Sequence, residues 1–229
     1  MKIIVFGASQ GLGKQVVQRG LAHGHTVTAF ARHPEKLGIS HERLRLVAGD
    51  AASASAVTAA LKGQRAAVCT LGLPTKQAIG FGRSPVLTAG IANIIEGMER
   101  HGVRRLVLET AIGTGESRRA LSWAAWLAFR GVLGYQFREK DRQERMVRES
   151  DLDWTIVRPS ALTNGPLTDR ILVDPPQSYG LFTHASRADV AEEIIRIVAD
   201  SEEFGGRAVT LSYARRGWRD FPRWLGEYR

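Results

Sequence analysis

The chain has 229 residues, of which 44% are hydrophobic and 24% are charged, and its formal net charge is +9. These proportions are those of a folded globular protein and exclude a disordered or fibrous chain. One domain is the better expectation, because doubly wound sheets often exceed about 200 residues as a single unit. The positive charge attracts anions, but the arginines form short pairs and no long basic block, so the sequence does not favour nucleic acid as a partner.

The first residues and the number of cysteines indicate in which cellular compartment the protein is expected. Residues 1–7 hold a short apolar run that is too brief for a signal-peptide core or a membrane span. Cys69 is the only cysteine, so no intrachain disulfide can form, as is usual in a reducing compartment. We therefore expect a cytoplasmic protein that does not bind a membrane, with Cys69 packed in its interior.

Short apolar runs alternate with longer helical patterns up to about residue 212. This alternation is typical of βα units, in which helices join parallel strands and cover both faces of the sheet. We expect strands near 2–7, 25–30, 44–49, 66–71, 103–109, 153–158 and 207–212. We expect helices near 11–23, 53–62, 85–101, 136–150 and 186–200, the last one starting with a capping sequence at Ser186 to Asp189. The predicted fold is a single Rossmann-type α/β domain over 1–229, with a doubly wound, mainly parallel sheet.

Two segments, 111–135 and 160–185, interrupt this alternation. Both follow strands that end at the carboxyl edge of the predicted sheet, where ligands bind in open α/β sheets. They are therefore candidate walls of a substrate site. The first contains Trp123, Trp126 and Phe129, whose spacing favours the buried face of a helix over contact with a ligand.

A glycine-rich loop over 7–13 follows the first predicted strand and opens the first predicted helix. Glycines at such a turn let the backbone approach the diphosphate of a dinucleotide, whose charge faces the helix N-terminus. The second predicted strand leads into Ala31-Arg32-His33, without the Asp or Glu that holds the ribose diol of NAD. Because a guanidinium suits the 2′-phosphate of NADP, we predict NADP(H) in preference to NAD(H).

Further short segments accompany this loop. They are Arg32 to Leu37, Gly49-Asp50, Leu71-Gly72, Thr110, Lys140, Asp153 to Pro159 and Ser186 to Ala191. Together they resemble the atypical short-chain dehydrogenase/reductases, and in particular the compact NAD(P)H-binding group of biliverdin reductase B (flavin reductase) and the nitrogen-metabolite-repression-like regulators. The resemblance extends over almost the whole chain, although the GxxxGxG spacing of the loop is similar to that of the classical enzymes.

The resemblance implies a role for each matching position. The diphosphate would contact Gly7, Ser9, Gln10, Gly11, Leu12 and Gly13, the 2′-phosphate Arg32, and the adenine Asp50 and Ala51. Leu71 and Gly72 would border the adenine ribose. The nicotinamide end would be bordered by Thr110, Lys140, Pro159, Ser160, Ala161 and Leu162.

Thr110, Tyr135 and Lys140 are the candidate catalytic residues. Classical members transfer a proton through a Tyr four residues before a Lys, whose ammonium lowers the phenol pKa and holds the nicotinamide ribose. Here that position is Gln136, and on a helix Tyr135 is rotated from it by about 100°, so Tyr135 serves only if the segment is not yet helical there. Ala111 next to Thr110 further weakens a Ser-Tyr-Lys mechanism. The alternative for Lys140 is a surface position in a charged helix.

These residues predict an NADPH-dependent oxidoreductase that passes hydride to a small planar or carbonyl acceptor of the flavin, quinone, bilin or ketone type. Two alternatives stay open: a non-catalytic NADP(H)-binding redox sensor, and a sugar-nucleotide-type epimerase or dehydratase, for which 213–229 is too short to form a substrate domain. The sequence has no metal-ligand spacing, so we expect no metal site. It also has no GxSxG motif, which argues against an α/β-hydrolase. The expected partner is a small-molecule substrate, and the expected state is a monomer or homodimer.

Overall fold

The computed structural model describes residues 1–72, 86–176, 178–180 and 183–214, without the side chains of 86 and 128–133. Within them an eight-stranded sheet has the order β3-β2-β1-β4-β5-β6-β10-β8. The strands are β1 (Lys2–Phe6), β2 (Thr26–Ala31), β3 (Leu44–Ala48), β4 (Ala66–Cys69), β5 (Arg105–Glu109), β6 (Asp153–Pro159), β8 (Leu172–Val173) and β10 (Arg207–Ser212). Their pairs are parallel, except for the antiparallel pair of β10 and β8. The direction of winding reverses between β1 and β4, which makes their carboxyl ends the switch point of the sheet.

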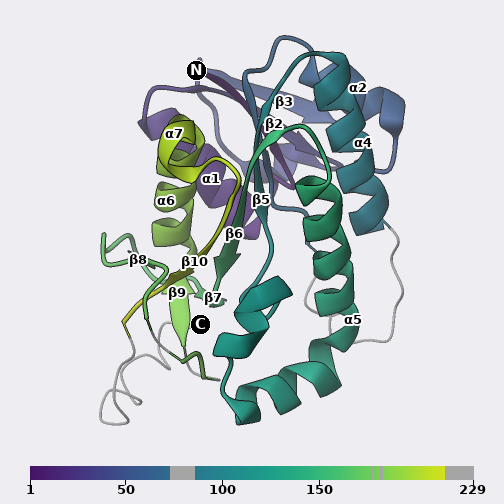
Figure 1. The fold of residues 1–229 in the computed structure, drawn as a ribbon. Helices are drawn as coiled ribbons and strands as arrows, with labels where there is room; N and C mark the ends of the chain where they lie inside the picture. The colour runs from purple at the N-terminus through teal and green to yellow at the C-terminus, as the bar shows by residue number, and fades with distance from the viewer. Residues whose placement is uncertain (73–85, 177, 181–182, 215–229) are drawn as a thin grey trace.

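Helices cover both faces of this sheet (Figure 1). One layer holds α1 (Gly11–Ala22), α6 (Arg187–Ala199) and the short α7 (Ser201–Phe204), and the other holds α2 (Ala54–Leu61), α4 (Val86–Arg100) and α5 (Trp123–Arg148). Two 3-10 turns, η1 (Pro34–Leu37) and η2 (Gly115–Ala120), and a parallel pair of short strands, β7 (Ala161–Thr163) and β9 (His184–Ser186), complete the described part. The predicted Rossmann-type fold is confirmed.

The strands are buried on both faces because each face is covered by a helix layer. Successive residues of a strand point to opposite faces. In β1, Ile3 and Val5 therefore pack with the core under α1 and α6, while Ile4 and Phe6 pack with the core under α2 and α4. Strands that are buried on both faces usually have near-continuous apolar sequences, and for this reason these strands could be predicted from the sequence.

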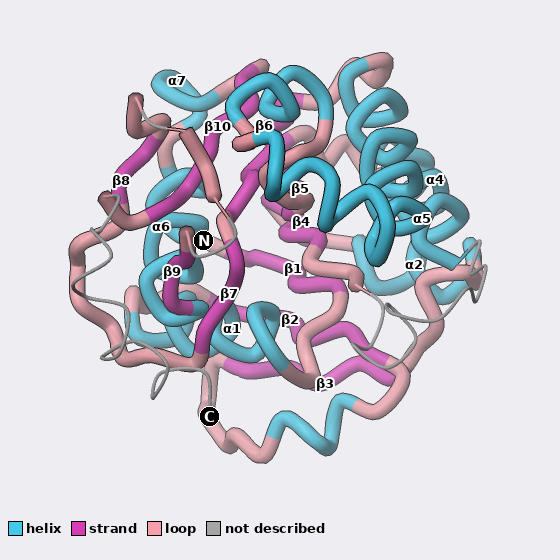
Figure 2. Tube along the Cα trace, turned by 90° about the horizontal axis from the view of Figure 1, so that it is seen from below, coloured by secondary structure: helices cyan, strands magenta, loops and turns pink. Residues whose placement is uncertain are grey.

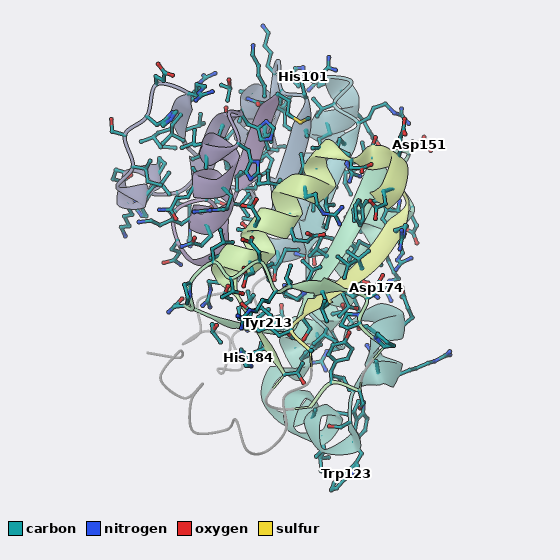
Figure 3. All side chains as sticks on the ribbon, turned by 90° about the vertical axis from the view of Figure 1, so that its left-hand side faces the viewer. His101, Trp123, Asp151, Asp174, His184 and Tyr213 are labelled. Carbon is teal, nitrogen blue, oxygen red and sulfur yellow. The ribbon has the colours of Figure 1, made fainter. Side chains whose placement is uncertain are left out.

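The main departure from the predicted elements is α5, which begins at Trp123 and not near residue 136. Its N-cap is Ser122, whose hydroxyl accepts a hydrogen bond from the Ala125 amide at 3.3 Å. The helical part of the prediction for 123–129 is therefore right, but the expected burial is wrong for Trp123 and Trp126, whose exposed fractions are 81% and 38%. Trp123 points away from the body of the molecule (Figure 3). The side chain of Phe129 lies outside the described residues.

The second predicted wall, 160–185, contains β7, β8 and most of β9, and so is more regular than expected. The predicted cap of the helix that follows it is confirmed. The Ser186 hydroxyl accepts a hydrogen bond from the Asp189 amide at 3.0 Å and donates one to the Asp189 carboxylate at 3.0 Å. Most of the tail 213–229 lies outside the described residues.

Candidate functional site

The glycine loop after β1 packs tightly against the end of β4. Gly7 has a φ of +86°, and a Cβ there would lie 2.7 Å from the carbonyl oxygen of Thr70. A Cβ on Gly13 would lie 2.3 Å from the carbonyl oxygen of Gly7 and 2.7 Å from the Thr70 hydroxyl. Only glycine fits at these two positions, so the loop forms the tight turn between strand and helix that a dinucleotide site requires.

The first turn of α1 has the features of an anion site. Its N-cap is Gln10, whose side chain makes no capping hydrogen bond, and no acidic residue lies in that turn. The amides of a helix start carry partial positive charge and bind phosphate groups when no side chain occupies them. Ser9 is half-buried and Gly11 is exposed, while Leu12 is buried against the sheet. The loop therefore fits the diphosphate that the sequence predicts for it.

The residues predicted to hold the adenosine lie at the ends of β2, β3 and β4, on the side of the sheet that Figure 2 views. Arg32 is exposed directly after β2, and among the described residues no carboxylate pairs with it. Asp50 accepts a hydrogen bond from the Ala52 amide at 2.9 Å, and the carbonyl of the buried Ala51 accepts one from Asn93 at 2.8 Å.

Leu71 and Gly72 follow β4, one half-buried and the other exposed. The fold thus brings the predicted adenosine residues to the same edge as the glycine loop. Their contacts with a cofactor stay a prediction.

Lys140 extends to the end of β5 and is not a surface residue. Its ammonium donates a hydrogen bond to the carbonyl of Thr110 at 2.9 Å and lies 3.4 Å from the Glu109 carboxylate. The exposed fractions of these two charged side chains are only 12% and 11%. Burial raises the pKa of Glu109, while the neighbouring Lys140 and Arg187 act in the opposite direction. Glu109 was not among the predicted site residues, although a carboxylate at the end of an apolar strand indicates a buried charge with a partner.

The hydroxyl of Thr110 belongs to a buried network behind this pair. It is completely buried and donates a hydrogen bond to Glu144 at 2.8 Å. The same carboxylate accepts hydrogen bonds from Thr114 and from Arg158, whose Nη2 lies 2.6 Å from Oε2. Thr110 therefore offers Lys140 its carbonyl oxygen, and its hydroxyl is engaged in holding the segment after β5.

Tyr135 could serve as the proton donor only if the segment around it were not helical, and the structure shows that this segment is helical. Because α5 is continuous from Trp123 to Arg148, Tyr135 is helical and lies one position from the site that would face Lys140. The structure therefore does not place its phenol where the classical proton donor lies.

The turn at 159–162 lies next to the segment that follows β5. The amide of Ile112 donates a hydrogen bond to the carbonyl of Pro159 at 3.0 Å. The amide of the buried Ser160 donates one to the carbonyl of Leu211 at 3.0 Å. Ala161 is exposed and Leu162 is half-buried. These four predicted residues therefore border the same edge as Lys140.

A cavity of about 290 Å³ lies between the segment after β5 and α5. Its apolar lining comes from Gly113, Leu121, Trp126, Gly134 and Phe137, and its charged lining from Arg118, Arg138 and Asp141. The Arg118 guanidinium donates a hydrogen bond to Asp141 at 2.5 Å. A lining that combines aromatic side chains with guanidinium groups suits a flat molecule that carries negative charge.

The described residues include no group of three or more His, Cys, Asp or Glu side chains that could hold a metal ion. In the same part of the chain, no helix is both long and apolar enough to cross a membrane.

Known proteins are similar to this chain in sequence and in fold. An uncharacterised chloroplastic protein of Arabidopsis thaliana is 28% identical over 202 residues, which cover 85% of this chain and 71% of the relative. Among solved structures, the anaerobilin reductase ChuY of Escherichia coli O157:H7 is 26% identical with a TM-score of 0.75, over 95% of this chain and 99% of the other.

Two more distant structures share the fold. The oxidoreductase ylbE of Lactococcus lactis has a TM-score of 0.79 at 19% identity, over 100% of this chain and 99% of the other. A short-chain dehydrogenase/reductase of Veillonella parvula, solved in complex with NADP, has a TM-score of 0.73 at 18% identity, over 92% and 93% of the two chains. The sequence itself matches the NAD(P)H-binding family over residues 7–201. The resemblance to the atypical short-chain reductases is thus confirmed, and the chain belongs to the NAD(P)H-binding family.

Proposed function

We propose that this protein is an NADPH-dependent reductase that delivers hydride to a small planar acceptor. The observation that carries the proposal is the position of Lys140. Its buried ammonium lies at the carboxyl end of β5, on the edge that also carries the glycine loop. In the classical short-chain enzymes that this chain resembles, a lysine in this region holds the ribose next to the nicotinamide.

Different residues of the chain bind different parts of the cofactor in this proposal. The amides of the glycine loop and of the first turn of α1 hold the diphosphate, Arg32 pairs with the 2′-phosphate, and Lys140 donates to the nicotinamide ribose. When bound, NADPH supplies a hydride, so that the acceptor gains this hydride and one proton while NADP⁺ is left. Arg32 supports the choice of NADPH, because its guanidinium has no carboxylate partner in the described part of the chain and is available to a phosphate.

The aromatic cavity beside α5 supports a flat acceptor. Trp126 and Phe137 contribute aromatic side chains to its lining, and Arg118 and Arg138 contribute guanidinium groups that suit an acceptor with acidic groups. The relationship to ChuY, an anaerobilin reductase, points in the same direction and makes bilins a class to test beside flavins and quinones.

A redox sensor without turnover is the second candidate. It is favoured by the engagement of the Thr110 hydroxyl with Glu144 and by the helical position of Tyr135, so that neither of these two predicted catalytic residues is positioned as a proton donor. No described feature favours an epimerase or dehydratase. Cytoplasmic location and a monomeric or homodimeric state stay predictions, and one relative is named as chloroplastic.

A fluorescence titration with NADPH and NADH, followed by oxidation assays with FMN, menadione and biliverdin, tests the proposal. We expect tighter binding of NADPH and acceptor-dependent oxidation. Lys140→Met should lower kcat/KM by at least about tenfold, the worth of one charge-assisted hydrogen bond. Lys62→Met is the matched control, because Lys62 is exposed at the end of α2. Tight binding without oxidation by any acceptor would favour the sensor.

A further inference from the structure

Arg187 occupies a position where a positive charge is unfavourable. It is the first residue of α6, and a cation in the first turn of a helix opposes the partial positive charge of the helix start. The side chain is also half-buried, and this burial lowers the pKa of its guanidinium. Its partners among the described residues are the Asn164 amide oxygen, 2.7 Å from Nη1, and the more distant carboxylate of Glu109. A neutral amide and a shared carboxylate compensate such a charge only in part.

The guanidinium of Arg187 faces the glycine loop. Helices α1 and α6 pack side by side and start at the same edge of the sheet (Figure 1). The Nε atom of Arg187 lies 3.9 Å from the point that a Cβ on Gly11 would occupy. Gly11 is the first residue of α1, at the place proposed for the diphosphate. A diphosphate there would bring negative charge next to this guanidinium, and planar guanidinium groups bind phosphate oxygens in pairs.

The first turn of α6 also holds the segment 164–169, part of the candidate substrate wall. Asp189 accepts hydrogen bonds from the amides of Thr168 and Asp169 at 2.7 and 2.9 Å and from the Thr168 hydroxyl at 2.7 Å. Tyr213, labelled in Figure 3, donates a further hydrogen bond to Asp189. The segment is therefore fastened to α6 at one end by Asp189 and at the other by the bond between Arg187 and Asn164.

We propose that Arg187 binds the diphosphate of the dinucleotide and thereby ties the bound cofactor to the segment 164–169. The inference rests on the proposed dinucleotide site but not on hydride transfer. Because NADPH and NADH share the diphosphate, Arg187 contributes equally to both, unlike Arg32. With the diphosphate on one side and Asn164 on the other, the Arg187 guanidinium is held in place, so the wall of the acceptor site becomes more rigid once the cofactor is bound.

A comparison of two arginine variants tests the first half of this proposal. We expect Arg187→Gln to weaken the binding of NADPH and of NADH by a similar factor, about tenfold or more, because one charged contact with a phosphate is lost. Arg187→Lys should recover part of the affinity. Arg32→Gln is the matched control, since it should weaken the binding of NADPH but not that of NADH. If folded Arg187→Gln, checked by circular dichroism, binds both nucleotides like the unaltered protein, the proposal is wrong.

Hydrogen exchange on the unaltered protein tests the second half and does not depend on a variant that folds. We expect NADP⁺ to slow exchange in residues 164–169, whereas adenosine 2′-monophosphate, which has no diphosphate, should not. Slowing by both ligands, or by neither, would overturn the link through Arg187. Failure of the reductase proposal looks different, because it would leave the nucleotide affinities and this exchange pattern intact while every acceptor assay stays negative.

Discussion

Replacing Glu144 by Gln tests whether buried charge holds the wall of the site after β5. Glu144 and Arg158 have exposed fractions of 3% and 2%, and the guanidinium donates to both carboxylate oxygens, at 2.6 and 3.0 Å. Thr110 and Thr114 donate to the same carboxylate. Gly115 lies against this pair so closely that a Cβ on it would lie 2.4 Å from Arg158 Nη2. The segment that follows Thr110 therefore has its position set by the ion pair.

The magnitude follows from the burial of both groups. Removal of one partner leaves the other charge uncompensated in the interior, which costs about 3–5 kcal/mol. Arg158 keeps a second bond, to the largely exposed Glu116 at 2.9 Å, so we expect the lower end, about 3 kcal/mol. For a chain of this size, about 1 kcal/mol changes Tm by about 2–4 °C, so Tm should fall by about 6–12 °C.

Urea unfolding followed by tryptophan fluorescence measures this loss. Glu99→Gln is the matched control, because Glu99 is exposed and should change the unfolding free energy by less than about 0.5 kcal/mol. The double variant Glu144→Leu with Arg158→Met should recover much of the loss, since it leaves no buried charge unpaired. A loss below about 1 kcal/mol for Glu144→Gln, with an unchanged m-value, would refute the reasoning that this pair is desolvated.

Three further outcomes follow from single residues. Gly13→Ala should abolish detectable NADPH binding in the fluorescence titration, because its Cβ would overlap the Gly7 carbonyl; an unchanged affinity would contradict the close packing of the loop. Burial raises the pKa of Cys69 to about 12, so iodoacetamide at about pH 8 should alkylate the urea-unfolded chain but not the native one, as mass spectrometry can show. A hydrogen bond from Arg158 lowers the pKa of Glu116 to about 2, so its small stabilising effect is complete above the unfolded pKa of about 4.3 and disappears as the pH falls toward 2. The stability difference between the unaltered protein and Glu116→Gln should therefore shrink over that range, and a difference independent of pH would argue against the bond.

The sheet and the glycine loop could be predicted from the sequence because both depend on local pattern. Strands buried on both faces are short apolar runs, as in β1 and β5, and a parallel sheet needs helices between them. The loop over 7–13 was recognisable because its glycines stand between a strand and a helix, where close backbone contact requires them.

The rest depends on contacts between distant parts of the chain. The start of α5 was missed because Gly131 and Gly134, poor helix formers, interrupt the pattern before residue 136. The partners Glu144 and Arg158, and likewise Glu109 and Lys140, come from different elements, and the sequence offers many equivalent charges for each. The remaining usable signal was the presence of Glu109 and Arg158 in apolar strands, since buried charges need partners.

The pairing of Lys140 with Glu109 restricts the acceptors that the proposed reductase can use. A proton taken from the Lys140 ammonium would leave the buried carboxylate of Glu109 with only the more distant Arg187 to compensate its charge, which is unfavourable. The Thr110 hydroxyl donates its hydrogen bond to Glu144, and Tyr135 lies off the position of the classical proton donor. Neither residue therefore supplies the proton instead of Lys140. The proton that accompanies the hydride must then come from water. Flavins, quinones and bilins accept hydride on these terms, whereas a simple ketone needs a proton donor at its oxygen as the hydride arrives. We therefore expect menadione, FMN or biliverdin to be reduced in the assay proposed above, and simple ketones to remain unreduced.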